Sequence, residues 1–255
     1  MAVFTIADTH LSLGDDKPMD VFPGWTGYVP KLEKNWRTLV KDTDTVVLPG
    51  DISWAMRLED AAADFAFLDS LPGTKLIGKG NHDYWWCTMK KMRAFAEERG
   101  FDTIRFLFNN AYLADGLALT GCRGWFFDAQ EEGDNAKVIL REAGRLRRGI
   151  EAALALGQKP VVFTHYPVAM DGKVVEPLMD VLLEYQIERV YFGPVHGDRS
   201  GRLKNYTVDG VRFTLASADS LYFCPLPVKA DGEPGFDARG EETDAGAKAP
   251  AEEPV

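Results

Sequence analysis

The sequence predicts an α/β fold in which sheets and helices pack as a sandwich. Short apolar runs alternate with longer amphipathic runs near both ends of the chain, and closely spaced apolar runs lie between them. The first pattern is typical of parallel strands joined by helices, and the second of hairpins. Ligands in such folds bind outside the carboxyl ends of the strands. The chain has 255 residues, of which 45% are hydrophobic, which is enough for one substantial core.

The first part of the chain reads as three strand–helix units. Strands are expected at residues 2–7, 45–48 and 75–77, and the helices that follow them at 32–41, 59–70 and 88–99. Gly100 follows the third helix directly, and a glycine there readily adopts the left-handed conformation that ends a helix. These units predict parallel strands with helices packed against them.

The second part combines hairpins with two further helices. Strands are expected at residues 104–108, 111–114, 117–121, 160–164, 189–192, 206–208 and 211–215, and helices at 134–156 and 174–185. The longer helix carries an apolar stripe of Ile139, Leu146, Ile150 and Leu154, which predicts that one face packs on a sheet. Asp209-Gly210, between the last two strands, is a strong signal for a tight hairpin turn.

Composition limits the classes of function. The net charge is −10 and the isoelectric point about 5.0, and an acidic surface argues against general nucleic-acid binding because it repels phosphate backbones. The three cysteines form no CxxC pair, so neither a disulfide framework nor a zinc–thiolate site is indicated. No apolar run approaches the roughly 18 residues that span a bilayer, and the N-terminus has no signal-peptide core. We expect a cytoplasmic protein without membrane contact, and leave its oligomeric state open.

The composition changes near the C-terminus. From Lys229 onward the chain consists mainly of Gly, Ala, Pro, Glu and Asp, with Phe236 and Val255 as the only bulky apolar residues. Such a segment cannot bury enough surface to offset the entropy lost on ordering. We therefore expect one globular domain over residues 1–228 and a disordered acidic tail over residues 229–255.

All four histidines of the chain lie just after predicted strands. They occur in the segments Asp8-Thr9-His10, Gly80-Asn81-His82-Asp83, Thr164-His165 and Val195-His196, and a fifth strand ends in Gly50-Asp51. Packing alone does not explain why every histidine occupies this kind of position. The pattern predicts one shared site at the strand ends.

The spacing within these segments indicates metal ligands. Asp8 and His10 are two residues apart, so in an extended segment both point to one side and reach the same metal. By the same rule His82 points away from Asn81. Asn81 then supplies a neutral oxygen ligand and His82 stays free for proton transfer. Carboxylate, amide and imidazole ligands without thiolates suit Mn, Fe, Zn or Ni, and ligand type does not choose among these metals.

The order of these motifs resembles the signature of the calcineurin-like metallophosphoesterase superfamily. The match runs from Asp-x-His through Gly-Asp, Gly-Asn-His-Asp and a lone His to Gly-x-x-His, over positions 8 to 196. The resemblance implies a four-layer α/β/β/α sandwich with a mixed central pair of sheets. It also implies a metal-dependent phosphoric ester hydrolase, a phosphomonoesterase or phosphodiesterase that uses two divalent metal ions and a metal-activated hydroxide.

The resemblance also implies a role for each matched residue. Asp8, His10 and His196 would hold the first metal, Asp51 would bridge, and Asn81 and His165 would hold the second. His82 would donate a proton to the leaving oxygen or stabilise its charge. Asp83 would orient His82, as carboxylates orient imidazoles in other metal sites.

One position departs from the family pattern. The last family motif is Gly-His-x-His, and this chain has Gly193-Pro194-Val195-His196, so Pro194 stands where the family usually has a ligand of the second metal. Three interpretations follow: a weaker but working second site, a mononuclear or metal-selective enzyme, or a degenerate site in a metal-stabilised binding or scaffold protein. Retention of His82 and Asp83, which metal binding does not need, argues against the last.

Other residues are candidates for substrate contact. Arg123 follows a predicted strand and can hold phosphate in a bidentate fork, the alternative being an ion pair with an acidic residue. Four aromatic residues follow the metal motifs and form either an aromatic wall or part of the core: Trp54, Tyr84, Trp85 and Trp86. We expect a small-molecule phosphate ester as substrate. A nuclease or a protein phosphatase is the alternative, and the lack of a basic groove argues against the nuclease.

Overall fold

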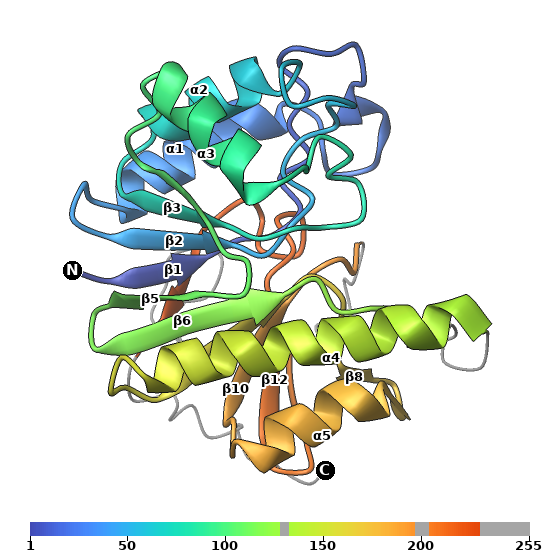
Figure 1. Ribbon diagram of the computed structural model, residues 1–255. Helices are drawn as coiled ribbons and strands as arrows, with labels where there is room; N and C mark the ends of the chain where they lie inside the picture. Colours follow the sequence, from blue (N-terminus) through green and yellow to red (C-terminus); the bar gives the residue numbers. More distant parts are fainter. Residues whose placement is uncertain (128–132, 197–203, 230–255) are drawn as a thin grey trace, which may run out of the picture.

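The computed structural model describes residues 1–127, 133–196 and 204–229, and in these ranges two sheets pack face to face between two layers of helices (Figure 1). Both sheets contain parallel and antiparallel strands. The predicted four-layer α/β/β/α sandwich with a mixed pair of sheets is therefore confirmed. Apart from Lys229, the predicted disordered tail lies outside the described residues, so the expected domain boundary stays a prediction.

The first sheet has the strand order β13-β1-β2-β3-β4. Its strands are β1 (Val3–Thr5), β2 (Thr45–Leu48), β3 (Thr74–Ile77), β4 (Ile104–Phe106) and β13 (Leu226–Val228). Strands β1 to β4 are parallel, and β13 runs antiparallel to β1. Three helices, α1 (Tyr28–Leu39), α2 (Ala62–Ser70) and α3 (Met89–Glu98), cover the outer face of this sheet, at the top of Figure 1.

The second sheet has the order β11-β12-β10-β7-β6-β5. Its strands are β5 (Ala111–Ala114), β6 (Leu117–Cys122), β7 (Pro160–Thr164), β10 (Arg189–Phe192), β11 (Asn205–Val208) and β12 (Val211–Leu215). The helices α4 (Gly133–Leu154) and α5 (Glu176–Glu184) cover its outer face. Within the described ranges, no helix is long and apolar enough to cross a membrane.

Three apolar clusters fill the spaces between the layers. One lies between the first sheet and α1 to α3, and a second between the second sheet and α4 and α5. The third lies between the sheets, where Val47 and Leu76 of the first sheet meet Phe163 and Tyr191 of the second. The rings of Phe163 and Tyr191 stack with centroids 5.4 Å apart. Each sheet is thus buried on both faces, as its continuous apolar strands predict.

The expected elements form, with shifted ends at several of them. Strands 45–48, 111–114, 160–164, 189–192 and 211–215 are confirmed at the predicted residues. The predicted hairpin at Asp209-Gly210 is also confirmed, with φ of 48° and 83° at the two turn residues. Helix α1 begins earlier than expected, because Pro30 is tolerated in the first helical turn. Helix α5 begins later, because Val174 pairs with Ala169 in a small hairpin of β8 (Ala169–Met170) and β9 (Lys173–Val174).

Strand β13 was not expected from the sequence. It consists of Leu226, Pro227 and Val228, and a proline lowers the expectation of a strand because it lacks the backbone N–H. Here the strand lies at the edge of the first sheet, so one of its two sides pairs with no neighbouring strand in the described part of the chain. Pro227 stands opposite Phe4 in that pairing. An edge position therefore accommodates the proline.

A buried lysine ties the first sheet to α2. Lys75 of β3 is fully buried, and its ammonium group donates hydrogen bonds to the carbonyl oxygens of Leu71 and Gly73, each at 2.6 Å. These carbonyls follow the C-terminal end of α2, where a helix leaves acceptors without partners. Burial lowers the pKa of Lys75 from its ordinary 10.5 to about 8.

This lowered pKa predicts a pH-dependent stability. Between about pH 8 and 10 the unfolded chain binds more protons at Lys75 than the folded chain, so stability from this residue rises with pH. Relative to Lys75→Met, the wild-type free energy of unfolding should increase by roughly 2 kcal/mol from about pH 7 to pH 10. Urea unfolding at both pH values measures this difference in the free energy of unfolding, and a variant at an exposed lysine, Lys90→Met, is the control. If wild type and Lys75→Met differ by the same free energy at both pH values, the lowered pKa of Lys75 is contradicted.

Candidate metal centre

The candidate centre lies where the two sheets meet at the carboxyl ends of their strands. Beyond β1, the backbone N–H of Ala7 donates to Ala216 O at 2.7 Å, and the N–H of Ala218 donates to Ala7 O at 2.9 Å. The first sheet is thereby joined to the segment that follows β12 of the second. The side chains predicted from the sequence follow β1, β2, β3, β7 and β10, so both sheets contribute to one site.

The chain after β1 and β2 is not extended, whereas the spacing argument assumed an extended segment. Asp8, His10 and Asp51 have φ of 58°, 43° and 53°, in the left-handed region. Backbone hydrogen bonds hold these conformations: Asp8 N donates to Gly50 O and His10 N to Asp51 O, both at 3.0 Å. The expectation of an extended Asp8–His10 segment is therefore wrong, although both side chains do reach one point. Such conformations cost free energy and persist where surrounding contacts enforce them.

Glycines allow the loops to approach each other. A Cβ atom at Gly80 would lie 2.0 Å from the Oδ1 of Asp51, and one at Gly193 would lie 2.5 Å from the Oδ2 of Asp8. Gly50 has φ of 142° and packs against Gly80 in the same way. A side chain at Gly80 or Gly193 would displace a carboxylate, and one at Gly50 would displace the backbone of Gly80, which agrees with the close approach that the sequence predicted.

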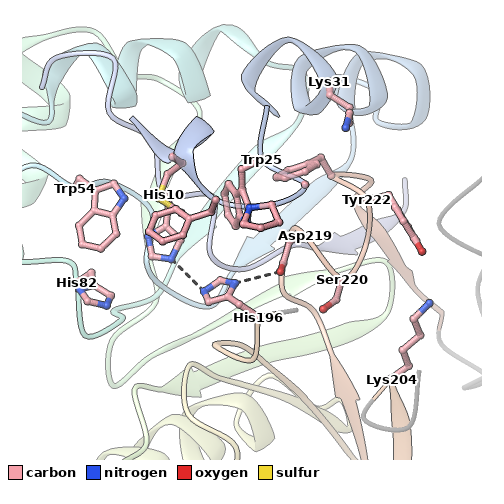
Figure 2. A pocket seen from close by; sticks show the side chains of 15 residues that line it. His10, Trp25, Lys31, Trp54, His82, His196, Lys204, Asp219, Ser220 and Tyr222 are labelled. Carbon is pink, nitrogen blue, oxygen red and sulfur yellow. Dashed lines mark hydrogen bonds and ion pairs between the residues drawn. The ribbon is translucent and has the colours of Figure 1, made fainter. Parts of the chain in front are cut away.

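Asp8, His10 and His196 form the first group of candidate ligands. One ligand atom from each lies within 4.8 Å of the others. The Nε2 atoms of His10 and His196 are 3.4 Å apart, and a dashed line joins them in Figure 2. This separation suits two nitrogen atoms that face one cation.

Asp8, Asp51 and His165 form the second group, again with ligand atoms within 4.8 Å of one another. His165 Nε2 lies 2.7 Å from Asn81 Oδ1 and 3.5 Å from Asp51 Oδ2. The same oxygen of Asp51 is 3.8 Å from His10 Nε2, so Asp51 faces both groups, as the predicted bridge requires. Asp8 also belongs to both groups, a shared position that the sequence did not indicate.

The buried charges of this cluster fit a cation. Both oxygens of Asp8 are buried and accept no hydrogen bond from the described part of the chain. Burial raises the pKa of Asp8 to about 7, and burial together with the charges of Asp83 and Asp8 raises the pKa of Asp51 to about 9. Burial lowers the pKa of His10 to about 3 and that of His165 below its ordinary range. A buried carboxylate without donors, as at Asp8, and neutral imidazoles, as at His10 and His165, are what a divalent cation needs as ligands.

Asp83 holds the loops of the site. Its buried carboxylate accepts hydrogen bonds at 2.7 to 3.1 Å from the backbone N–H groups of Asp51, Ile52 and Gly80 and from Nε1 of Trp85. The expectation that Asp83 orients the His82 imidazole is therefore wrong, because these donors occupy its oxygens. Asp83 instead fixes the backbone on which Asp51 stands.

His82 lies beside the two groups. Its ring is 4.5 Å from that of Trp54 and 5.7 Å from that of His10, and its backbone N–H donates to Asp51 Oδ1 at 2.8 Å. Burial, with the charges of His196 and Lys17, lowers the pKa of His82. The imidazole is therefore held neutral near the ligand groups.

Asp219 is a site residue that is absent from the ligand and catalytic set predicted from the sequence. Its Oδ1 lies 3.1 Å from His196 Nδ1, which directs the other ring nitrogen toward His10 (Figure 2). Burial alone would lower the pKa of His196, but the bond to Asp219 and the charge of Asp8 raise it above its ordinary value. A carboxylate on the far nitrogen of a metal-facing histidine fixes the ring orientation. The available signal was the position of Asp219 in the loop that follows the strand 211–215.

The other substrate candidates differ in position. The Arg123 guanidinium lies 4.2 Å from the Trp125 ring and forms no ion pair within the described residues. Of the four aromatic residues, Trp85 belongs to the core, whereas Trp54 stacks on His10 with ring centroids 4.9 Å apart. The aromatic wall is thus represented by Trp54. A phosphate contact by Arg123 stays a prediction.

A buried cluster of carboxylate, amide and imidazole groups at strand ends, open to a pocket, is typical of metal-dependent hydrolases. The sequence matches the family described as Calcineurin-like phosphoesterase over residues 1–211, so the chain belongs to that family of metal-dependent phosphoesterases. The resemblance in the motifs is thereby confirmed. A comparison with curated proteins gives no match.

Solved structures share the fold at low sequence identity. A phosphopantetheinyl hydrolase from Mycobacterium tuberculosis is 14% identical, with a TM-score of 0.51 over 92% of this chain and 98% of its own. The protein TT1561 of Thermus thermophilus is also 14% identical, with a TM-score of 0.53 over 93% of this chain and 94% of its own. These likenesses support the architecture alone.

The contacts of Asp83 predict the effect of replacing it. Asp83→Asn should weaken Mn²⁺ binding by about 10- to 100-fold, because one of the two acceptor oxygens becomes a donor and the loop of Asp51 loses its anchor. Calorimetric titration with Mn²⁺ measures the affinity, and Asp60→Asn, at a partly exposed carboxylate paired with Arg57, serves as control. Unchanged affinity with reduced turnover would instead indicate a role toward His82.

Proposed function

We propose that the protein hydrolyses a phosphate ester of a small molecule, with two divalent cations held by the predicted ligands. These ligands are Asp8, His10, Asp51, Asn81, His165 and His196. The observation that carries the proposal is their convergence from both sheets beside a pocket of about 780 Å³. Bound cations supply positive charge to the phosphate and lower the pKa of water so that it acts as nucleophile.

The residues of the chain then have separate tasks. Asp51 lies between the two ligand groups, and Asp83 keeps its loop in place. We assign to His82 the leaving oxygen: a neutral imidazole donates one N–H hydrogen bond, which stabilises negative charge there, and only its protonated form would transfer a proton. Asp219 keeps the His196 ring in its orientation.

The pocket favours a small organic substrate. Its lining includes Trp25, Trp54 and Phe223 together with His10 and His82. An aromatic wall suits a compact apolar group, while the net charge of −10 disfavours a nucleic acid. The alternative is a metal-stabilised binding or scaffold protein whose site is degenerate because of Pro194. The position of His82 at the pocket supports the enzyme instead.

Turnover of chromogenic esters tests the proposal. With added Mn²⁺, the protein should hydrolyse 4-nitrophenyl phosphate or bis(4-nitrophenyl) phosphate, and the preference between them separates monoesterase from diesterase. His82→Ala should lower kcat by about 10²- to 10⁴-fold with metal content unchanged. Tyr84→Phe, two residues away and exposed, is the control. Absence of turnover by the metal-replete wild type would favour the scaffold.

The proline at position 194 predicts unequal metal sites. With Asp8 and Asp51 shared, the first metal would have the imidazoles of His10 and His196, whereas the second would have the imidazole of His165 and only the neutral amide of Asn81. Calorimetry with Mn²⁺ should therefore resolve one tighter and one weaker site. Pro194→His should raise second-site occupancy, because it adds an imidazole.

Pro194→Ala is the matched control, since it also releases the fixed φ but adds no ligand. Two sites of equal affinity in the parent protein would show that another residue fills this position. Asp198, the first candidate from the sequence, lies outside the described residues.

A further inference from the structure

The pocket beside the metal centre extends well beyond it. We call it the aromatic pocket, and its apolar lining includes Met19, Phe22, Trp25, Trp54, Tyr222 and Phe223. His10, His82 and His196 line one end (Figure 2). At about 780 Å³ the pocket has room for much more than a phosphate group, including the organic part of a substrate.

Trp25 links the metal centre to the rest of the aromatic pocket. It is 3% exposed, and its ring makes edge contacts with His10 at 5.9 Å, with His196 at 5.8 Å and with Phe223 at 5.1 Å between centroids. These contacts fix the ring before any ligand binds. This part of the pocket lining is therefore preformed.

The other end of the aromatic pocket carries positive charge. Lys31 and Lys204 line it. The Lys31 ammonium group lies 5.4 Å from the ring centroid of Phe223, and that of Lys204 lies 5.8 Å from the ring centroid of Tyr222. Neither lysine forms an ion pair in the part of the chain that the structure describes. Figure 2 shows both lysines on the side away from Trp54 and His82. Unpaired cations at one pocket end are unexpected in a chain of net charge −10.

A buried hydroxyl group also lines the aromatic pocket, and Figure 2 shows it between His196 and Lys204. Ser220 is 8% exposed and lines the aromatic pocket, and its Oγ has no hydrogen-bond partner within the described residues. The neighbouring acid, Asp219, is bonded to His196. A buried hydroxyl without a partner lowers its free energy by donating to an acceptor such as an anionic oxygen.

We propose that the aromatic pocket selects phosphate esters whose leaving group carries a planar apolar body and a second anionic group. The planar body would lie along the aromatic lining, and the anion, a carboxylate or a second phosphate, would bind at the end of the pocket that Lys31 and Lys204 line, beside Ser220. That the phosphate ester at the metal centre is cleaved rests on the proposed phosphoesterase function. Binding of the second anionic group at the lysine end does not depend on that function and is measured separately.

A series of biphenyl compounds tests both parts. The substrates are biphenyl-4-yl phosphates with a 4′-carboxylate, a 4′-phosphonate or a neutral 4′-carboxamide, with the corresponding phenyl compounds as shorter members. The biphenyl-4-ylphosphonates with the same 4′-groups are the non-hydrolysable ligands, and calorimetry on the Mn²⁺-loaded protein gives their Kd. We expect the anionic compounds to exceed the carboxamide by about tenfold in affinity and in kcat/KM.

Variants assign the preference to the far end. Lys31→Met and Lys204→Met should each reduce the anion-to-carboxamide ratio, and the double variant should bring it close to one. Lys34→Met, an exposed lysine of the same helix that does not line the aromatic pocket, is the matched control. Ser220→Ala should reduce the ratio by a smaller factor.

The outcomes separate the two proposals. Equal affinity of the wild type for the anionic and the neutral biphenyl ligands would overturn the inference, even if every ester is hydrolysed. An anion preference that survives in the double variant would overturn it as well. An anion preference that depends on the lysines, without turnover of any ester, would support the anion site and contradict the phosphoesterase proposal.

Discussion

The buried carboxylate of Asp83 joins the two loops on which the metal-facing side chains stand. Its oxygens accept bonds from backbone groups at both Asp51 and Gly80, so the loops after β2 and β3 are fixed relative to each other. That contact requires Gly80 to lack a side chain, and it holds Asp51 against the His82 backbone. Burial raises the pKa of Asp83, and hydrogen bonds from the backbone N–H groups of Asp51, Ile52 and Gly80 and from the Trp85 ring keep its carboxylate in place. The positions of Asp51, Asn81 and His82 all depend on this one group.

Around this anchor, two sheets contribute opposite halves of one centre. The first sheet supplies Asp8, His10, Asp51 and Asn81, and the second supplies His165 and His196. Each half alone offers an incomplete ligand set, so the chemistry exists only where the sheets are in contact. The aromatic pocket continues from this junction, and Trp25 touches both His10 and His196. Recognition of the organic group and of the phosphate would therefore share a rigid wall, which reduces the ordering needed on binding.

Much of this arrangement follows from the sequence, because the spacing of apolar residues and the positions of turn residues are local signals of secondary structure. The four histidines and their neighbours could be assigned to one site, since carboxyl ends of parallel strands gather at one edge. Other features depend on tertiary contacts. The left-handed conformations of Asp8 and His10 arise from bonds to the neighbouring loop, and no local signal announces them. The bonds of Asp83 to remote backbone groups, and the contact between Asp219 and His196, are likewise set by packing.

Strand β13 is synthesised after all the other strands, and this order affects how the first sheet is completed. It covers the outer edge of β1, with Val3 opposite Val228. During translation β1 to β4 leave the ribosome long before residues 226–228, so the nascent first sheet carries an open edge while the whole second sheet is being made. An open edge is a template for pairing with another chain. The emerging protein is thus more exposed to aggregation than the finished one, and this short terminal strand ends that period.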